Sequence, residues 1–255
     1  MAERWLLLRG LGRESGHWGA FASQLQQAFG NHRIDTLDLP GTGILFQQSS
    51  PNRIAAITDV CRQQALTDGR LTQPVNLLAI SLGGMVAWDW LQRYPQEISR
   101  AVLINTSFAS HSRFYQRLRW QAYQALLGIM VDKDLSHREL AIVRLVSNLP
   151  DQQRQIIGRQ WTAIQQRHPV SSANLLRQIY AAARYQPDPL RPGQPVLLLN
   201  SNGDRLVAPA CSQAIAAAYQ LPLRTHPSAG HDLPLDDGAW VTDCIREWMT
   251  AGDSR

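Results

Sequence analysis

The stretch Leu77-Leu78-Ala79-Ile80-Ser81-Leu82-Gly83-Gly84-Met85 decides the fold of this chain. The apolar residues before Ser81 predict a buried strand, and the Gly-Gly pair after it opens a helix. A serine at such a junction lies at the tip of a sharp, strained strand-to-helix turn that exposes its hydroxyl. The residues two positions either side of the serine must be small. Gly83 meets that need. On the other side, Ala79 stands where the usual G-x-S-x-G pattern of such turns has glycine, and one extra methyl group is the smallest possible departure from that pattern.

Length and composition indicate one large α/β domain. The chain has 255 residues, of which 44% are apolar, and it is long enough to bury a substantial core. No apolar run approaches the roughly 20 residues that span a bilayer, and the apolar part of the first residues is too short for a signal peptide. The three cysteines, Cys61, Cys211 and Cys244, are too widely spaced for a disulfide framework or a metal cluster. We expect them to be buried thiols of a cytoplasmic protein.

Positive charge is concentrated in one segment. The chain carries a net charge of +5, and residues 108–187 hold 11 Lys and Arg against 4 Asp and Glu, a net +7. A basic segment can bind nucleic acid, a membrane surface or an acidic protein. This one contains no nucleic-acid motif, so we expect no nucleic-acid partner and interpret it as a solvated helical face.

Strand and helix signals alternate through the first hundred residues and again after residue 195. We expect strands at Trp5–Leu8, Ile34–Leu39, Val75–Ile80, Ala101–Asn105, Val196–Asn200 and Leu223–His226. We expect helices at about His17–Phe29, Arg53–Leu66, from the Ser81 turn to Tyr94, Pro209–Tyr219 and Ala239–Met249. Helices between apolar strands imply parallel pairing with right-handed crossovers. The predicted fold class is therefore α/β, with a mostly parallel sheet of about six strands flanked by helices.

The alternation is interrupted once. From about Ser107 to Pro187 the sequence is helical throughout and rich in Gln and Arg. We expect residues 107–187 to form a helical cap inserted after the strand at 101–105. Residues 1–106 and 188–255 then make up the core.

An acid and a histidine follow later strands of the predicted sheet. A serine hydroxyl is a poor nucleophile unless a base takes its proton, and the base needs an orienting acid. In sheets of this kind the chemistry collects at the carboxyl ends of the strands. Asp204 follows the strand at 196–200, and His231 lies in the loop after the last strand. The sequence therefore predicts a catalytic triad of Ser81, Asp204 and His231.

Other polar residues are weaker candidates for the orienting acid and the base. Asp232 and Asp236 lie beside His231, on the wrong loop for the orienting acid. The end of the strand at 101–105 offers only Asn105 and its neighbours Thr106 and Ser107. We interpret His17 as structural. The remaining histidines of the helical stretch lack metal-ligand spacing, namely His111, His137 and His168.

In four sequence features the chain resembles the α/β-hydrolase fold superfamily, in its branch with a helical cap. They are the nucleophile elbow at Ser81, the turn Asp38-Leu39-Pro40-Gly41-Thr42-Gly43, the Gly203-Asp204 loop with Val207 and Pro209, and Gly230-His231. The resemblance covers essentially the whole chain, although the first strand pair of larger members is missing.

The resemblance also implies an oxyanion hole and identifies one departure from the family. By position, the two backbone N–H donors are those of Leu82, after the nucleophile, and Leu11, in the loop after the first strand. The family usually has His-Gly in that loop, and this chain has Arg9-Gly10. The hydrogen bonds of the missing histidine must therefore be replaced. An alternative role for Arg9 is to place a positive charge near the pocket.

The nucleophile type narrows the function. Dehalogenases and epoxide hydrolases of this fold carry an aspartate at the elbow, and this chain carries Ser81. The resemblance implies a serine esterase, a carboxylesterase that acts on a small or medium acyl ester without a metal or organic cofactor. The triad does not choose among ester, thioester, amide and carbon–carbon bonds.

Two alternatives stay open beside the esterase. The chain is similar to the bacterial pimeloyl-carrier-protein methyl ester carboxylesterases. The substrate is then an ester on an acidic acyl carrier protein that docks on the basic cap. The other alternative is a non-catalytic α/β-hydrolase-like binding module. Neither the acyl chain length nor the oligomeric state follows from the sequence.

Overall fold

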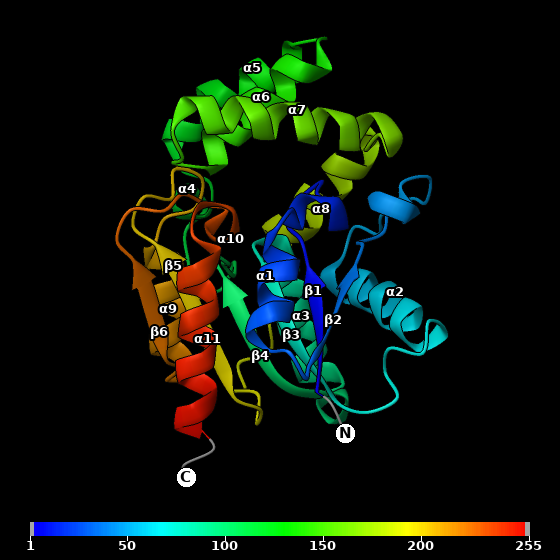
Figure 1. Cartoon of the computed structure of the whole chain (residues 1–255), viewed down its shortest axis with the longest axis vertical. Coiled ribbons are helices and arrows are strands. Elements are labelled where there is room, and N and C mark those ends of the chain that lie inside the picture. Colours follow the sequence, from blue (N-terminus) through cyan, green and yellow to red (C-terminus); the bar gives the residue numbers. More distant parts are fainter. Residues whose placement is uncertain (1–2, 253–255) are drawn as a thin grey trace.

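Six strands form one sheet in the order β2-β1-β3-β4-β5-β6 in the computed structural model, which describes residues 3–252. The strands are β1 (Arg4–Leu8), β2 (Arg33–Leu37), β3 (Val75–Ile80), β4 (Ile98–Ile104), β5 (Val196–Ser201) and β6 (Leu223–His226). Every neighbouring pair is parallel, so the carboxyl ends of all six strands meet at one edge (Figure 1). The predicted α/β class and parallel six-stranded sheet are confirmed.

Helices cover both faces of the sheet, because successive strand side chains point to opposite faces. In β3, Leu77 and Ala79 face one apolar cluster while Leu78 and Ile80 face the other. The first cluster includes side chains of α2 (Ile54–Thr67), α3 (Leu82–Arg93) and α9 (Ala210–Tyr219), and the second those of α1 (Phe21–Ala28) and α11 (Gly238–Gly252). Burial on both faces explains why the central strands read as continuous apolar runs.

A helical segment, residues 107–187, lies between β4 and β5 in the chain. Its helices are α4 (Phe114–Arg117), α5 (Tyr123–Val131), α6 (Leu135–Val146), α7 (Asp151–Arg167) and α8 (Ser172–Arg184), with the 3-10 turn η4 (Trp120–Ala122). Helices α5, α6 and α7 lie across the carboxyl edge of the sheet, and α8 lies beside the end of β1 (Figure 1). The segment has an apolar cluster of its own, built around Val143, Trp161 and Ile164.

Short helical turns punctuate the loops of the carboxyl edge and the opposite end. They are η1 (Ser15–Trp18), η2 (Gly43–Leu45), η3 (Pro95–Glu97) and α10 (Leu233–Asp236). The predicted helix at His17–Phe29 is in fact η1 followed by α1. Gly19 separates the two with a left-handed φ of +51°, which glycine adopts without strain and which ends the first turn.

Two predicted boundaries are wrong, the first for a local reason. The predicted strand at Ile34–Leu39 stops at Leu37, because the side chain of Asp38 binds the loops around it: its Oδ1 accepts from the N–H of Ser15 (2.7 Å) and its Oδ2 from that of Ile44 (3.0 Å). Residues 107–113 are not helical, and the first helix of this segment, α4, begins at Phe114.

The three cysteines are free and buried, as predicted. Burial raises the pKa of the Cys61 thiol to about 12, so this thiol stays protonated and unreactive at neutral pH. Within residues 3–252, no helix combines the length and apolarity needed to cross a bilayer.

Candidate active site

Ser81 lies between β3 and α3 in a strained backbone conformation. Its φ of +56° and ψ of −118° fall in a region that residues with a side chain rarely adopt. Its N–H donates to the carbonyl of Ile104 (2.9 Å), and its own carbonyl accepts from the hydroxyl of Thr106 (2.8 Å). Two contacts with β4 and the residues just after it therefore hold the turn, and they leave the Ser81 side chain half-buried at the carboxyl edge.

The small residue at position 83 is required by the end of β1. A Cβ on Gly83 would lie 2.5 Å from the carbonyl oxygen of Arg9 and 2.6 Å from that of Leu8. These carbonyls, of the last residue of β1 and the residue after it, supply the nearest atoms, and Ala79 does not. Helix α3 can begin this close to β1 only with glycine there. The methyl of Ala79 lies fully buried in the core.

His231 and Asp204 meet at the same edge. Nδ1 of His231 lies 2.7 Å from Oδ2 of Asp204, and both side chains are buried. The other carboxylate oxygen of Asp204 accepts from the N–H groups of Leu206 (2.7 Å) and Val207 (2.9 Å). Because both oxygens are engaged, the carboxylate has a fixed orientation. It can hold the imidazole in one tautomer and stabilise its cation.

Asn105 connects the loop of His231 to the sheet, a role that the sequence alone did not indicate. Its Nδ2 donates to the carbonyl of His231 (2.8 Å), and its Oδ1 accepts from the N–H of Ser201 at the end of β5 (3.1 Å). Its φ of +47° is left-handed, which asparagine tolerates better than most residues. An asparagine that ends a buried apolar strand is the signal that points to such a position.

The end of α6 braces the loops of both Asp204 and His231. The Asn148 amide donates to the carbonyls of Gly203 (3.0 Å) and Ser228 (2.9 Å), which belong to the two loops. The carboxylate of Asp236 accepts from the N–H of Asn148 (2.9 Å) and from that of Gly230 (2.6 Å). Burial raises the pKa of Asp236. These contacts tie the helical segment to the residues next to His231.

The predicted oxyanion donors lie on two different elements. Leu82 is the first residue of α3, where helix N–H groups have no partner within the helix. Leu11 lies in the loop after β1, and the next residue, Gly12, donates its N–H to the buried side chain of Gln178 on α8 (2.9 Å). Among residues 3–252, neither the Leu11 nor the Leu82 N–H has a hydrogen-bond acceptor.

Arg9 stands where the resemblance leads one to expect histidine. Its guanidinium forms a buried ion pair with Asp232 and lies over the ring of Trp18, with its carbon 4.8 Å from the ring centroid. The positive charge is therefore matched by a carboxylate and shielded by an aromatic ring. It does not stand free beside the loop.

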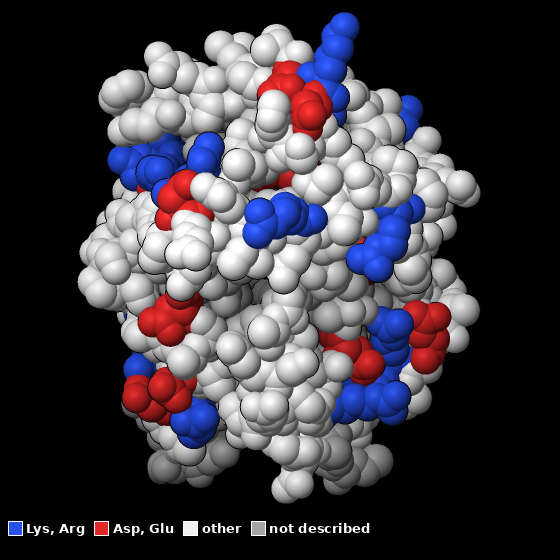
Figure 2. Space-filling view, turned by 45° about the horizontal axis from the view of Figure 1, so that its top comes forward, with Lys and Arg blue, Asp and Glu red and all other residues white. Residues whose placement is uncertain are grey.

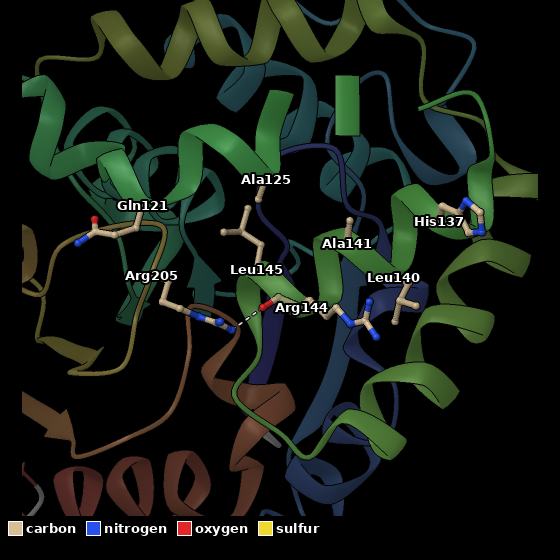
Figure 3. Close-up of a pocket in the computed structure, with 8 residues that line it drawn as sticks. All are labelled: Gln121, Ala125, His137, Leu140, Ala141, Arg144, Leu145 and Arg205. Atoms are coloured by element: carbon tan, nitrogen blue, oxygen red, sulfur yellow. Dashed lines mark hydrogen bonds between the residues drawn. The ribbon is translucent and has the colours of Figure 1, made fainter. Parts of the chain in front are cut away.

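One cavity lies away from these residues. It has a volume of about 420 Å³ and opens between α5 and α6 (Figure 3). Its lining residues are Gln121, Ala125, His137, Leu140, Ala141, Arg144, Leu145 and Arg205. Both arginines have partners: Arg205 donates to the carbonyl of Ser147 (2.9 Å), and Arg144 pairs with Asp151 (3.1 Å). Except for Arg205, the residues that line the cavity belong to the helical segment, and none of them is Ser81, Asp204 or His231.

In the part of the chain that the structure describes, no three His, Cys, Asp or Glu side chains are placed to hold a metal ion.

Comparison with known proteins adds the family context. A sequence model described as the alpha/beta hydrolase family matches residues 5–243. The biotin biosynthesis bifunctional protein BioHC of Teredinibacter turnerae is 32% identical over 104 residues, which cover 40% of this chain and 17% of that protein. The chain thus matches less than a fifth of the length of this curated relative.

Solved structures of similar shape include two hydrolytic enzymes. The esterase RhEst1 from a Rhodococcus species has a TM-score of 0.76 at 17% identity, covering 98% of this chain and 90% of its own. The enol-lactonase from Burkholderia xenovorans has a TM-score of 0.76 at 16% identity, covering 98% and 92%. At this level of identity, the likeness shows a shared fold alone.

His17 lies buried where the loop after β1 meets α7. Its Nε2 is 3.0 Å from Nη1 of Arg13, and its ring packs edge-on against Trp161 with centroids 5.0 Å apart. A guanidinium can only donate, so Nε2 accepts and the ring is neutral. Burial lowers the pKa of His17 well below its usual value, and the charges of Arg13 and Arg9 lower it further.

We therefore predict that acid destabilises the protein through His17. The unfolded chain binds a proton at this histidine below its ordinary pKa of 6.5, and the folded protein does not. The stability is thus fully present above pH 6.5 and is lost as the pH falls. Below pH 6.5, the unfolding free energy of the native protein should fall more steeply than that of His17→Gln, by up to about 1.4 kcal/mol per pH unit.

Urea unfolding between pH 7.5 and pH 5 measures this difference. His137→Gln is the control, because His137 lies on α6 with 71% of its side chain exposed. It should keep the native slope. Equal slopes for the native protein and His17→Gln would contradict the assignment.

Proposed function

The chain belongs to the alpha/beta hydrolase family, and we propose that within it the protein is a serine hydrolase that cleaves carboxylic esters of small or medium acyl substrates. The observation that carries the proposal is the buried 2.7 Å contact between His231 and Asp204. It occurs at the same sheet edge as a serine with a left-handed backbone, Ser81. Side chains of these types at this edge match a nucleophile, its base and the orienting acid.

In the proposed reaction, His231 acts first as base and then as acid. It takes the proton of the Ser81 hydroxyl while Oγ bonds to the carbonyl carbon of the ester. The tetrahedral intermediate collapses, and the leaving alcohol takes the proton from His231. A water molecule then gives a proton to His231 and attacks the acyl-enzyme, the carbon–Oγ bond breaks, and Ser81 regains its proton. Asp204 stabilises the imidazolium in both halves.

The N–H groups of Leu82 and Leu11 are the proposed donors to the oxyanion of each tetrahedral intermediate. The position of Leu82 at the start of α3 supports this role, because helix N-termini favour negative charge. The link from Gly12 to the buried Gln178 supports a fixed position for Leu11. Each donor is worth about 3 kcal/mol of barrier in enzymes of this kind.

We also propose that residues 107–187 act as a cap over a core of residues 1–106 and 188–255. Two observations support it: the separate apolar cluster of this segment and its place across the carboxyl edge (Figure 1). A substrate held between this segment and Ser81 is then screened from water. The three free, buried thiols favour a reducing compartment such as the cytoplasm.

Hydrolysis of p-nitrophenyl esters from acetate to long acyl chains tests the proposal. Ser81→Ala should lower kcat about 10⁴- to 10⁶-fold, because the nucleophile is lost, and Asp204→Asn about 10⁴-fold, because the imidazole loses its tautomer. Ser23→Ala, at an exposed position of α1, should leave kcat unchanged. Activity that survives in Ser81→Ala would contradict the serine mechanism. The acyl chain length that is hydrolysed fastest indicates the size of the acyl-binding pocket.

A second candidate is an ester carried on an acidic acyl carrier protein. Two observations favour it: the net charge of +7 on residues 108–187 and the similarity to a biotin biosynthesis protein. Figure 2 shows basic side chains at several separate points of the upper face, with a few acidic ones beside them. Such a spread of charge steers an acidic partner over a broad surface.

The carrier hypothesis predicts salt responses of different size for two substrates. Raising NaCl from 50 to 500 mM should lower kcat/KM for a carrier-linked ester about tenfold, because salt screens the docking charges. The p-nitrophenyl ester should change less than about twofold. Arg159→Glu, exposed on α7, should weaken the carrier reaction, and Arg191→Glu, outside the segment, should not. The same salt response for both substrates would rule out charge-guided docking.

A further inference from the structure

A buried ion pair joins the loop of Leu11 to the loop of His231. Arg9 comes directly after β1 and two residues before Leu11, and Asp232 comes directly after His231. Nη1 of Arg9 lies 3.1 Å from Oδ1 of Asp232, and Nη2 contacts Oδ2 as well. The two side chains are only 4% and 3% exposed. A two-pronged contact thus connects positions that are 223 residues apart in the chain.

Each partner is also held from a second side. The guanidinium carbon of Arg9 lies 4.8 Å from the centroid of the Trp18 ring. The N–H of Asp232 donates to the carbonyl of Val146 at the end of α6 (2.8 Å). The carbonyl of His231 is fixed by Asn105 (2.8 Å). His231 therefore lies between two anchors, Asn105 on its carbonyl and the ion pair on the residue that follows it.

The ion pair supplies geometry more than stability. The attraction within a buried ion pair offsets little more than the free-energy cost of removing its charges from water. Apolar pairs of equal volume often stabilise a folded protein equally well. A guanidinium bound to both oxygens of a carboxylate, by contrast, fixes the two groups in one plane. Among residues 3–252, Nε of Arg9 has no acceptor, so the contacts with Asp232 and Trp18 set its orientation.

We propose that Arg9 and Asp232 are positioning residues that hold the Leu11 amide and the His231 ring in a fixed relation. This inference rests on the proposed function, in which those groups stabilise the oxyanion and move the proton. The pair takes over the loop support that a histidine usually provides at position 9. Neither residue touches the substrate. Without the pair, the two loops shift relative to each other, so kcat falls while KM stays nearly constant.

The test is the double variant Arg9→Gln/Asp232→Asn, which removes both charges together and leaves no unpaired one. Its kcat on p-nitrophenyl esters should fall about 10- to 100-fold, with KM within about twofold, because small misplacements of reacting groups have effects of this size. Arg9→Lys keeps the positive charge but cannot bind both oxygens of the Asp232 carboxylate as a planar guanidinium does. It should fold and give an intermediate kcat.

The control is a second two-pronged pair far from this edge. Arg62 of α2 binds Glu97 of η3 through contacts of 2.6 to 2.9 Å. Arg62→Gln/Glu97→Gln should lower the unfolding temperature without changing kcat or KM. A folded Arg9→Gln/Asp232→Asn variant with native kcat would overturn the proposal, and so would an equal loss of kcat in the control.

Proton NMR separates this inference from the proposed function. The Nδ1 proton between His231 and Asp204 should give a downfield resonance in the native protein. It should broaden or shift in Arg9→Gln/Asp232→Asn and persist in the Arg62/Glu97 control. If the native protein hydrolyses none of the esters, the proposed function fails. The resonance alone then tests whether Arg9 and Asp232 position His231. An unchanged resonance in Arg9→Gln/Asp232→Asn overturns the positioning role.

Discussion

The left-handed backbone of Ser81 is the constraint on which the rest of the site depends. It persists because the residues at the end of β4 bind the turn, with Ile104 accepting its N–H and the Thr106 hydroxyl donating to its carbonyl. The intervening residue, Asn105, binds the carbonyl of His231 and the end of β5. Three consecutive residues therefore set Ser81, the histidine loop and the strand before Asp204 relative to one another. Strain in one turn is maintained by the surrounding sheet.

The helical segment contributes to the same arrangement from above. Gln178 of α8 holds Gly12 beside Leu11, and Asn148 after α6 holds the carbonyls of Gly203 and Ser228. Each contact is a side-chain amide bound to a loop carbonyl or N–H, which satisfies polar groups that burial would otherwise leave unpaired. Whatever moves these helices therefore moves the loops of the sheet edge. These contacts couple the helical segment to the loops that carry Leu11, Asp204 and His231.

Local patterns predicted the sheet, and long-range contacts remained hidden. The apolar runs, the Ser81 junction and the loops of Asp204 and His231 are short-range signals, so the sequence located them. The ion pair joins Arg9 and Asp232, which are 223 positions apart in the chain. The hydrogen bonds of Asn105 join it to residues 96 and 126 positions away. No local pattern indicates such pairings before the sheet has formed. Gly19 is different: the predicted helix at His17–Phe29 is continuous, although a glycine inside it is a local signal for a break.

Covalent labelling with a fluorophosphonate tests the central claim most directly, because it reports an activated serine without any assumption about the substrate. Intact-mass analysis and peptide mapping of the labelled native protein should show one phosphonyl adduct per chain, on the peptide that contains Ser81. His231→Gln should label much more slowly, because no base then takes the serine proton. No adduct, or an adduct that persists in Ser81→Ala, would contradict the account.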